Sequence, residues 1–126
     1  NGVSLFESGA ILLYIAEHYG QESTNPKDRA LITQWIAFAN ATLSPAIFVQ
    51  TVRERDFDGI MDVLNMLYEG KKVLVGDRWT AADCAVSAYL AYIPIFAKET
   101  DLNRWPNVKR QTEDTLNNAN YKAIMS

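Results

Sequence analysis

The chain has 126 residues, of which 48% are hydrophobic and 21% are charged, so we expect one folded, soluble domain rather than a disordered segment. The formal net charge of -3 and the lack of a dense Lys/Arg cluster exclude an electrostatic footprint for nucleic acid or for an anionic membrane surface. The longest apolar run, residues 85–97, is too short to cross a bilayer. A single cysteine, Cys84, cannot form an internal disulfide, which agrees with a reducing, cytoplasmic compartment.

Helical periodicity dominates the first half of the chain, and strand alternation is nearly absent. Residues 1–6 are predicted to finish a short strand, and residues 8–19 to form an amphipathic helix. A long helix is predicted from Pro26 to about residue 55. Pro45 should kink this helix, because proline lacks the N–H donor and its ring crowds the preceding turn.

The second half of the chain continues the helical pattern. We predict a helix that starts at Asp56 or Asp58 and ends near residue 68. Residues 81–96 contain one charged side chain, Asp83, and a helix that is apolar on every side has to be surrounded by protein. This helix is therefore predicted to be the buried centre of an all-α bundle, followed by a helix from residue 106 to about residue 116.

The buried helix has a recognisable start. Thr80 and Asp83 have the spacing of a capping box, in which each side chain accepts a hydrogen bond from the other residue's backbone N–H. A carboxylate in an apolar region could instead be catalytic. We favour the structural interpretation, because the spacing accounts for Asp83 fully.

Two motifs resemble one protein family. The segment L-F-E-S-G-A-I-L-L-Y-I-A-E-H-Y, residues 5–19, resembles the end of the glutathione-binding domain of glutathione transferases. The segment L-V-G-D-R-W-T-A-A-D-C-A-V, residues 74–86, resembles the capping-box segment of the same family's all-helical C-terminal domain. The motifs occur in the family's order, and they imply a glutathione transferase C-terminal-like helical bundle around a buried central helix.

The resemblance implies a role for a polar pair near the start of the chain. In the family, the residue that matches Ser8 holds the γ-glutamyl carboxylate of glutathione, and the residue that matches Glu7 takes the neighbouring ammonium group. A helix N-terminus suits a carboxylate, because it offers free N–H donors and a partial positive charge. The alternative is that Ser8 merely caps the helix and Glu7 interacts favourably with its dipole.

The resemblance also implies an apolar pocket for an electrophile, lined by the first long helix of the helical domain. Four side chains are candidates for this pocket: Trp35, Phe38, Thr42 and Phe48. Their helical spacing is equally typical of a core. The lone His18 has no metal-ligand partner at suitable spacing, so we expect no metal site, and Cys84 is expected to pack as a small apolar group.

The resemblance covers only the tail of the thioredoxin-like domain. Residues 1–20 are interpreted as its remnant and residues 21–126 as the helical domain. The family's thiol-activating residue and its cis-proline loop are not found, so we expect this chain to be inactive alone, with glutathione as a co-substrate only in the complete protein.

Three explanations of the chain stay open on the sequence. It could be a piece of a transferase, a natural short protein, or a non-catalytic docking domain like those of elongation factor gamma subunits and some aminoacyl-tRNA synthetases. The apolar face of residues 8–19 is expected to be exposed, which predicts a homodimer, exchange of the N-terminal segment between chains, or another protein partner.

Overall fold

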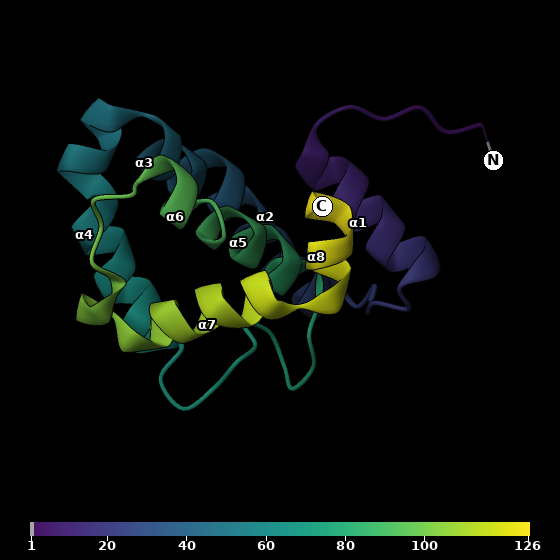
Figure 1. Cartoon of the computed structure of the whole chain (residues 1–126). Helices are drawn as coiled ribbons and strands as arrows, with labels where there is room; N and C mark the ends of the chain where they lie inside the picture. The colour runs from purple at the N-terminus through teal and green to yellow at the C-terminus, as the bar shows by residue number, and fades with distance from the viewer. Residues whose placement is uncertain (1) are drawn as a thin grey trace.

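A computed structural model describes residues 2–126, and these residues form the expected all-helical bundle (Figure 1). The elements in chain order are α1 (Ser8–Tyr19), α2 (Pro26–Phe38), the π-helical turn η1 (Ala39–Leu43), α3 (Ser44–Phe48), α4 (Gln50–Leu67), α5 (Ala81–Leu90), α6 (Ile93–Phe96), the 3-10 turn η2 (Leu102–Arg104), α7 (Pro106–Asn117) and α8 (Ala119–Met125). The prediction of an all-α fold is confirmed.

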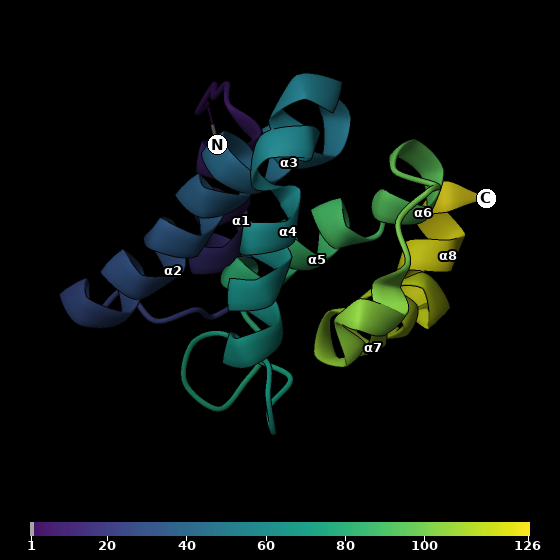
Figure 2. The ribbon, with the colours of Figure 1, turned by 90° about the vertical axis from the view of Figure 1, so that its left-hand side faces the viewer.

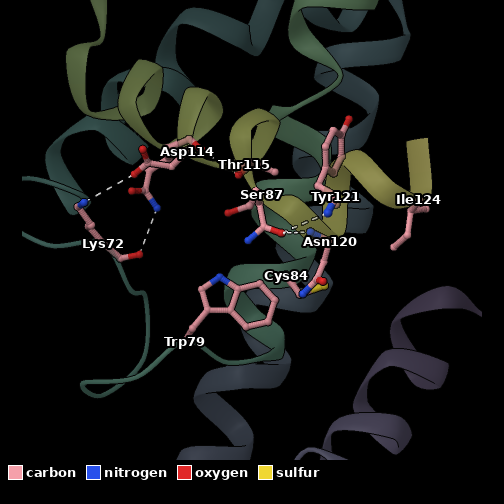
Figure 3. A pocket seen from close by; sticks show the side chains of 12 residues that line it. Lys72, Trp79, Cys84, Ser87, Asp114, Thr115, Asn120, Tyr121 and Ile124 are labelled. Atoms are coloured by element: carbon pink, nitrogen blue, oxygen red, sulfur yellow. Dashed lines mark hydrogen bonds and ion pairs between the residues drawn. The ribbon is translucent and has the colours of Figure 1, made fainter. Parts of the chain in front are cut away.

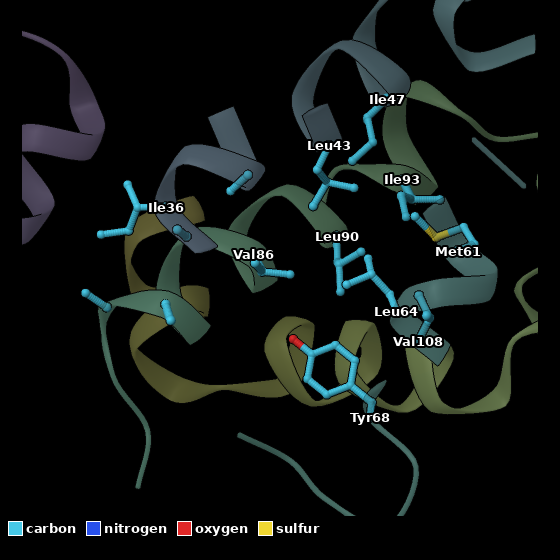
Figure 4. Close-up of a cluster of buried hydrophobic side chains, with 14 of the residues drawn as sticks. Ile36, Leu43, Ile47, Met61, Leu64, Tyr68, Val86, Leu90, Ile93 and Val108 are labelled. Atoms are coloured by element: carbon cyan, nitrogen blue, oxygen red, sulfur yellow. The ribbon is translucent and has the colours of Figure 1, made fainter. Parts of the chain in front are cut away.

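Helix α5 lies at the centre of the bundle. It packs against α1, α2 and η1 on one side and against α7 on the other, an arrangement visible in Figure 2. Side chains from α2, η1, α3, α4, α6 and α7 meet those of α5 in the core (Figure 4). The largest fully buried apolar side chains of the core are Leu43, Ile47, Met61, Leu64, Tyr68, Val86, Leu90, Ile93 and Val108. The burial of α5 follows from its composition, because it has no polar face to present to water.

The predicted single helix over residues 26–55 is wrong in its end point. The helix passes through Pro45 and breaks at Val49, whose extended backbone (φ -108°, ψ 114°) separates α3 from α4. The π-helical turn before Pro45 widens the helix, with Ser44 donating to the Ala39 carbonyl five residues back. The π-helical turn and the proline therefore lie next to each other, and both are features at which helices bend. The predicted helix start at Asp56 or Asp58 is therefore also wrong, because α4 begins at Gln50.

The predicted helix over residues 81–96 is likewise divided. Helix α5 ends at Leu90, and the short α6 begins at Ile93. Pro94 explains the division, because its ring would clash with the carbonyl of Leu90 in a continuous helix and it has no N–H to donate. Arg53 of α4 links α3 to the end of α6, since its Nη1 donates to the Ile47 carbonyl at 2.6 Å and to the Phe96 carbonyl at 2.9 Å.

The predicted N-terminal strand does not form within residues 2–6, and Asn1 lies outside the described residues. A strand requires a neighbour for its backbone N–H and C=O groups, and no strand occurs anywhere in residues 2–126. The segment instead runs exposed toward α1, with Phe6 84% exposed.

One helical stretch, Pro26–Phe48, is long and apolar enough to cross a membrane by length and composition alone. Its mean hydropathy is 1.2, and 33% of its best window is buried inside the protein. Core helices pass the same test, and α2 and η1 pack against α5. The stretch is therefore weak evidence for a membrane span.

Candidate functional site

The N-terminus of α1 carries an unusual backbone. Glu7 precedes the helix with φ 70° and ψ 115°, a conformation that non-glycine residues rarely adopt. Such strain costs roughly 1–3 kcal/mol and concentrates at functional sites. The Glu7 side chain makes no capping hydrogen bond, and both Glu7 and Ser8 are exposed. The arrangement leaves the N–H groups at the start of α1 available to an anion, since these have no acceptor within the helix.

Close helix packing fixes this N-terminus in place. A Cβ atom added to Gly9 would lie 2.7 Å from Ile36 Cγ2 and 2.8 Å from Asn40 Nδ2. Only a residue without a side chain therefore allows α1 to approach α2 this closely. Farther along α1, Glu17 forms an ion pair with Arg29 of α2 at 2.6 Å. The start of α1 is consequently held by the close approach of Gly9 to Ile36 and Asn40.

A cavity of about 340 Å³ opens beside Ser8. Helix α2 and the η1 turn contribute Ile36 and Asn40, while α5 and the turn after it contribute Tyr89 and Tyr92. The Tyr89 hydroxyl donates to Asn40 Oδ1 at 2.8 Å, which fixes the orientation of both side chains. The cavity thus combines the start of a helix with aromatic walls, and small-molecule sites commonly place polar groups beside apolar walls in this way.

The four residues proposed for an electrophile pocket do not converge on this cavity. Trp35 and Phe38 are half-buried and meet edge to face, with ring centroids 5.4 Å apart. Thr42 is exposed in the π-helical turn. Phe48 is 41% exposed and lies next to the cavity, with its ring 6.2 Å from that of Tyr89 and 5.4 Å from that of Tyr92.

Sequence reasoning missed the residues that line the cavity from α2 and η1. Ile36 and Asn40 follow Trp35 and precede Thr42 in the chain, so they occupy a neighbouring face of the same helix. Their spacing of four residues places both on one side of the helix. That spacing was the available signal, but the choice of helix face depends on where α1 docks.

The start of α5 has the hydrogen bonds of a capping box. Thr80 N–H donates to Asp83 Oδ2 at 2.9 Å, and the Thr80 hydroxyl accepts from the first turn, with Ala82 N–H at 3.3 Å. The second Asp83 oxygen accepts from Leu74 N–H at 2.9 Å, which ties the preceding loop to the helix. Burial raises the pKa of Asp83, and these N–H donors oppose the rise. Because both oxygens already accept hydrogen bonds from the backbone, Asp83 is suited to structure rather than to catalysis.

A third acceptor at this helix end is Glu22, which sequence reasoning missed. Its Oε1 accepts from Ala81 N–H at 2.6 Å, so the loop after α1 is hydrogen-bonded to the start of α5. Glu22 is distant from α5 in sequence, and no local spacing predicts this contact. The bond joins α1 to the centre of the bundle.

The remaining candidate residues have local roles. Burial raises the pKa of the Cys84 thiol, and the carboxylates of Asp83 and Glu22 raise it further, which disfavours the reactive thiolate. His18 is exposed and stacks on Tyr14, with ring centroids 4.0 Å apart. Across residues 2–126, no group of three or more His, Cys, Asp or Glu side chains is arranged to hold a metal ion.

Comparison with known proteins places this geometry in a family. The family model described as "Glutathione S-transferase, C-terminal domain" matches residues 49–117. A curated relative, glutathione S-transferase D7 of Drosophila melanogaster, is 31% identical over 87% of this chain. The chain spans 56% of that relative's length.

Solved structures share the fold. Ure2p5 from Phanerochaete chrysosporium, cocrystallized with 1-(S-glutathionyl)-2,4-dinitrobenzene, aligns with a TM-score of 0.81 at 22% identity over 96% of this chain and 67% of its own. A glutathione transferase from Pseudomonas putida with glutathione disulfide bound aligns with a TM-score of 0.80 at 23% identity, over 96% of this chain and 61% of its own. With the family model covering most of the bundle, this chain belongs to the glutathione S-transferase family and contains its C-terminal domain.

Proposed function

We propose that the complete protein conjugates glutathione to electrophiles, and that Glu7 and Ser8 hold the amino-acid head of glutathione. The observation that carries this proposal is the strained backbone of Glu7, which immediately precedes the N-terminus of α1 beside a cavity. Strain of this kind is retained where the surrounding structure or a function requires it.

The chemistry of the pair suits a zwitterionic ligand. The γ-glutamyl end of glutathione carries a carboxylate and an ammonium group on one carbon atom. The Ser8 hydroxyl and the first N–H groups of α1 can donate to that carboxylate. The Glu7 carboxylate can accept from the ammonium group, with the charge-assisted strength of such bonds. Adjacent donor and acceptor residues therefore match adjacent acceptor and donor groups of the ligand.

The cavity beside Ser8 supports a flat, apolar electrophile. Tyr89 and Tyr92 line it, and Phe48 extends the aromatic surface toward solvent. Aromatic side chains bury large apolar areas and favour stacked or edge-to-face contact with other rings. The conjugate in the Ure2p5 crystals is an aryl compound of this kind, which suggests a dinitrophenyl halide as the test substrate.

Conjugation also requires a donor that stabilises the glutathione thiolate. We propose that residues 1–20 are the end of a thioredoxin-like domain whose remaining part supplies this donor, and that residues 21–126 are the helical domain. On this proposal the chain alone is inactive, and the single cysteine fits a cytoplasmic protein.

Calorimetric titration with glutathione tests the proposal on this chain and on a longer form that includes the thioredoxin-like part. We expect weak or undetectable binding to the chain alone, because a few polar contacts do not offset the entropy of association. The longer form should bind, and Ser8→Ala should weaken its affinity about tenfold by removing one hydrogen bond to a charged group. Ser4→Ala, in the exposed segment before α1, is the matched control. Absence of binding in both forms contradicts the proposal.

A second candidate function is a non-catalytic interaction module, and one observation favours it. Three apolar side chains on α1 are exposed: Ile11 at 38%, Ile15 at 50% and Tyr19 at 71%. A contiguous apolar surface of this kind tends to recruit a partner. The partner proposed is a second copy of the chain, as a homodimer or with exchanged N-terminal segments. This function predicts a stable protein complex and no affinity for glutathione; transferase-like domains of elongation factor gamma subunits are docking surfaces of this kind.

A further inference from the structure

The cavity beside Ser8 has two dissimilar ends along α5. One end adjoins a larger cavity of about 600 Å³, drawn in Figure 3, and shares Cys84 and Ala88 with it. The other end is bounded by the rings of Tyr89 and Tyr92. Small side chains offer little surface to a flat ring, whereas tyrosine rings can stack on it or meet its edge. The tyrosine end is therefore the better match for an aryl electrophile.

Two phenylalanines continue this aromatic surface beyond Tyr92. Phe48 ends α3 and Phe96 ends α6, and their ring centroids lie 5.4 Å and 5.7 Å from that of Tyr92. The two phenylalanine rings meet edge to face, with their centroids 4.9 Å apart. They are 41% and 49% exposed. This pair, the aromatic rim, therefore extends the wall of the cavity with apolar surface that a ligand can cover.

One side chain, Arg53 of α4, holds the backbone at both residues of the rim. Its Nη1 donates to the Ile47 carbonyl, in the peptide unit that leads into Phe48, and to the carbonyl of Phe96. Both carbonyls lie in the last turn of a short helix, where they have no N–H partner within that helix. The Arg53 side chain is 18% exposed, and its Nε lies 3.4 Å from Glu99 Oε1, which restrains the guanidinium further. The relative position of the two rings therefore depends on Arg53.

From these contacts we propose that Phe96 contacts the electrophile and that Arg53 is a positioning residue for the aromatic rim. The proposal rests on the proposed conjugation of glutathione, and it adds which part of the electrophile is recognised there: an aromatic ring that extends from Tyr92 over the rim. Arg53 acts through the backbone, because its Nη1 donates to two carbonyls and its charge is paired with Glu99. Loss of Arg53 should therefore weaken binding of the aryl group and leave binding of glutathione unchanged.

Steady-state kinetics of the longer form with a dinitrophenyl halide tests the role of Arg53. Arg53→Met keeps an unbranched stem and removes the donors, so the KM for the halide should rise about three- to tenfold while the KM for glutathione stays unchanged. Destabilisation alone lowers the amount of folded enzyme and hence the apparent kcat, and it leaves both KM values unchanged. Arg53→Lys should recover part of the effect, because one ammonium nitrogen can donate to both carbonyls. An unchanged KM for the halide in Arg53→Met overturns the positioning role.

A double variant tests whether Arg53 acts through the ring of Phe96. Phe96→Ala removes a half-exposed ring, so it is expected to fold and to raise the KM for the halide about three- to tenfold. Adding Arg53→Met to it should raise that KM by less than about twofold more, because the positioned ring is gone. Single effects that multiply would overturn the proposal. Arg55→Met is the matched control, since it removes an exposed ion pair with Asp56 on the same helix and should change neither KM.

Calorimetry on the longer form separates this proposal from the proposed function. The ligands are glutathione and 1-(S-glutathionyl)-2,4-dinitrobenzene, the conjugate in the Ure2p5 crystals. We expect the conjugate to bind more tightly than glutathione, and the ratio of the two affinities to fall about three- to tenfold in Arg53→Met and in Phe96→Ala. Phe96→Ala alone serves if Arg53→Met fails to fold. If neither ligand binds, the proposed function fails and the role of the rim fails with it. If glutathione binds and the ratio is the same in the unmodified protein and the variants, only the role of the rim is overturned.

Discussion

At the scale of single residues, two fully buried polar side chains, Asp83 and Tyr68, differ in their hydrogen bonds. Asp83 is surrounded by backbone donors, and its two oxygens accept from Thr80 and Leu74. The Tyr68 hydroxyl is buried in the core beside Gln111 and Ser87, and it makes no hydrogen bond of normal geometry to either. Burial raises the pKa of Tyr68 and the nearby Asp83 charge raises it further, while Gln111 and Ser87 beside it partly offset the rise. Asp83 therefore stabilises the fold through its hydrogen bonds, whereas Tyr68 stabilises it mainly through the burial of its ring.

Tyr68→Phe tests this assignment of roles. At neutral pH, we expect the free energy of unfolding to change by less than about 1 kcal/mol, because the lost hydroxyl makes no hydrogen bond of normal geometry. The fold raises the pKa of Tyr68 above its ordinary value of 10.0, because burial favours the neutral phenol. The contribution of the neutral phenol to the free energy of unfolding is therefore fully present below pH 10. It is lost as the pH rises above 10, where the unfolded chain ionises first. From pH 10 to 11 the variant should therefore gain up to about 1.4 kcal/mol on the unmodified chain.

Urea unfolding of both proteins at neutral and alkaline pH measures the difference. The comparison with Tyr68→Phe removes the contribution of other alkaline groups, because both proteins share them. A loss of well over 1 kcal/mol at neutral pH would mean that the hydroxyl makes a hydrogen bond that contributes to stability, and it would contradict this assignment.

At the scale of helices, the position of α1 depends on a residue without a side chain. The close approach of α1 to α2 at Gly9 and the bond from Ala81 to Glu22 hold α1 against the bundle. Gly59, in the interior of α4, has open space where a Cβ would be added. The chain thus contains two helical glycines with opposite structural requirements.

Substituting each glycine by alanine should have opposite effects. Gly9→Ala should lower the free energy of unfolding by roughly 1–3 kcal/mol, because Ile36 and Asn40 have to move. Gly59→Ala should raise it by about 0.5–1 kcal/mol, since alanine restricts the unfolded chain and meets nothing in the fold. Thermal or chemical unfolding gives both values. Stabilisation by Gly9→Ala would show that α1 is not packed as closely as described.

At the scale of the whole molecule, the exposed apolar face of α1 should determine self-association. Ile15→Glu places a charge at the centre of that face, and a charge buried in an apolar interface is costly unless it is paired. We expect the unmodified chain to elute as a dimer in size-exclusion chromatography with light scattering, and Ile15→Glu to elute as a monomer.

The matched control for this prediction is Met66→Glu on α4, where the methionine is 63% exposed. It adds the same charge at an equally exposed apolar position outside the α1 face and should leave the dimer intact. If the unmodified chain is a monomer at every concentration used, both the homodimer and the exchange of N-terminal segments are ruled out.

Local patterns in the sequence were sufficient to predict the all-α class, the central position of α5 and the capping contacts between Thr80 and Asp83. Each depends on residues a few positions apart: an uninterrupted apolar surface excludes water from a helix, and a three-residue spacing brings a carboxylate to the helix start. The same reasoning placed Glu7 and Ser8 at the beginning of α1. Helix ends were less accurate, because a π-helical turn absorbs Pro45 and Arg53 stabilises the break at Val49.

The lining of the cavity beside Ser8 was decided only by tertiary structure. Gln111 is likewise an ordinary polar residue on an amphipathic helix until α7 packs against α5 and its amide donates to the Lys72 carbonyl. Asn40 likewise acquires a role only when α1 docks at Gly9 and Tyr89 hydrogen-bonds to it. Local sequence determines which faces are apolar, but contacts between distant segments determine which polar groups are left facing a cavity. That is the physical reason why the bundle follows from the sequence and its binding sites do not.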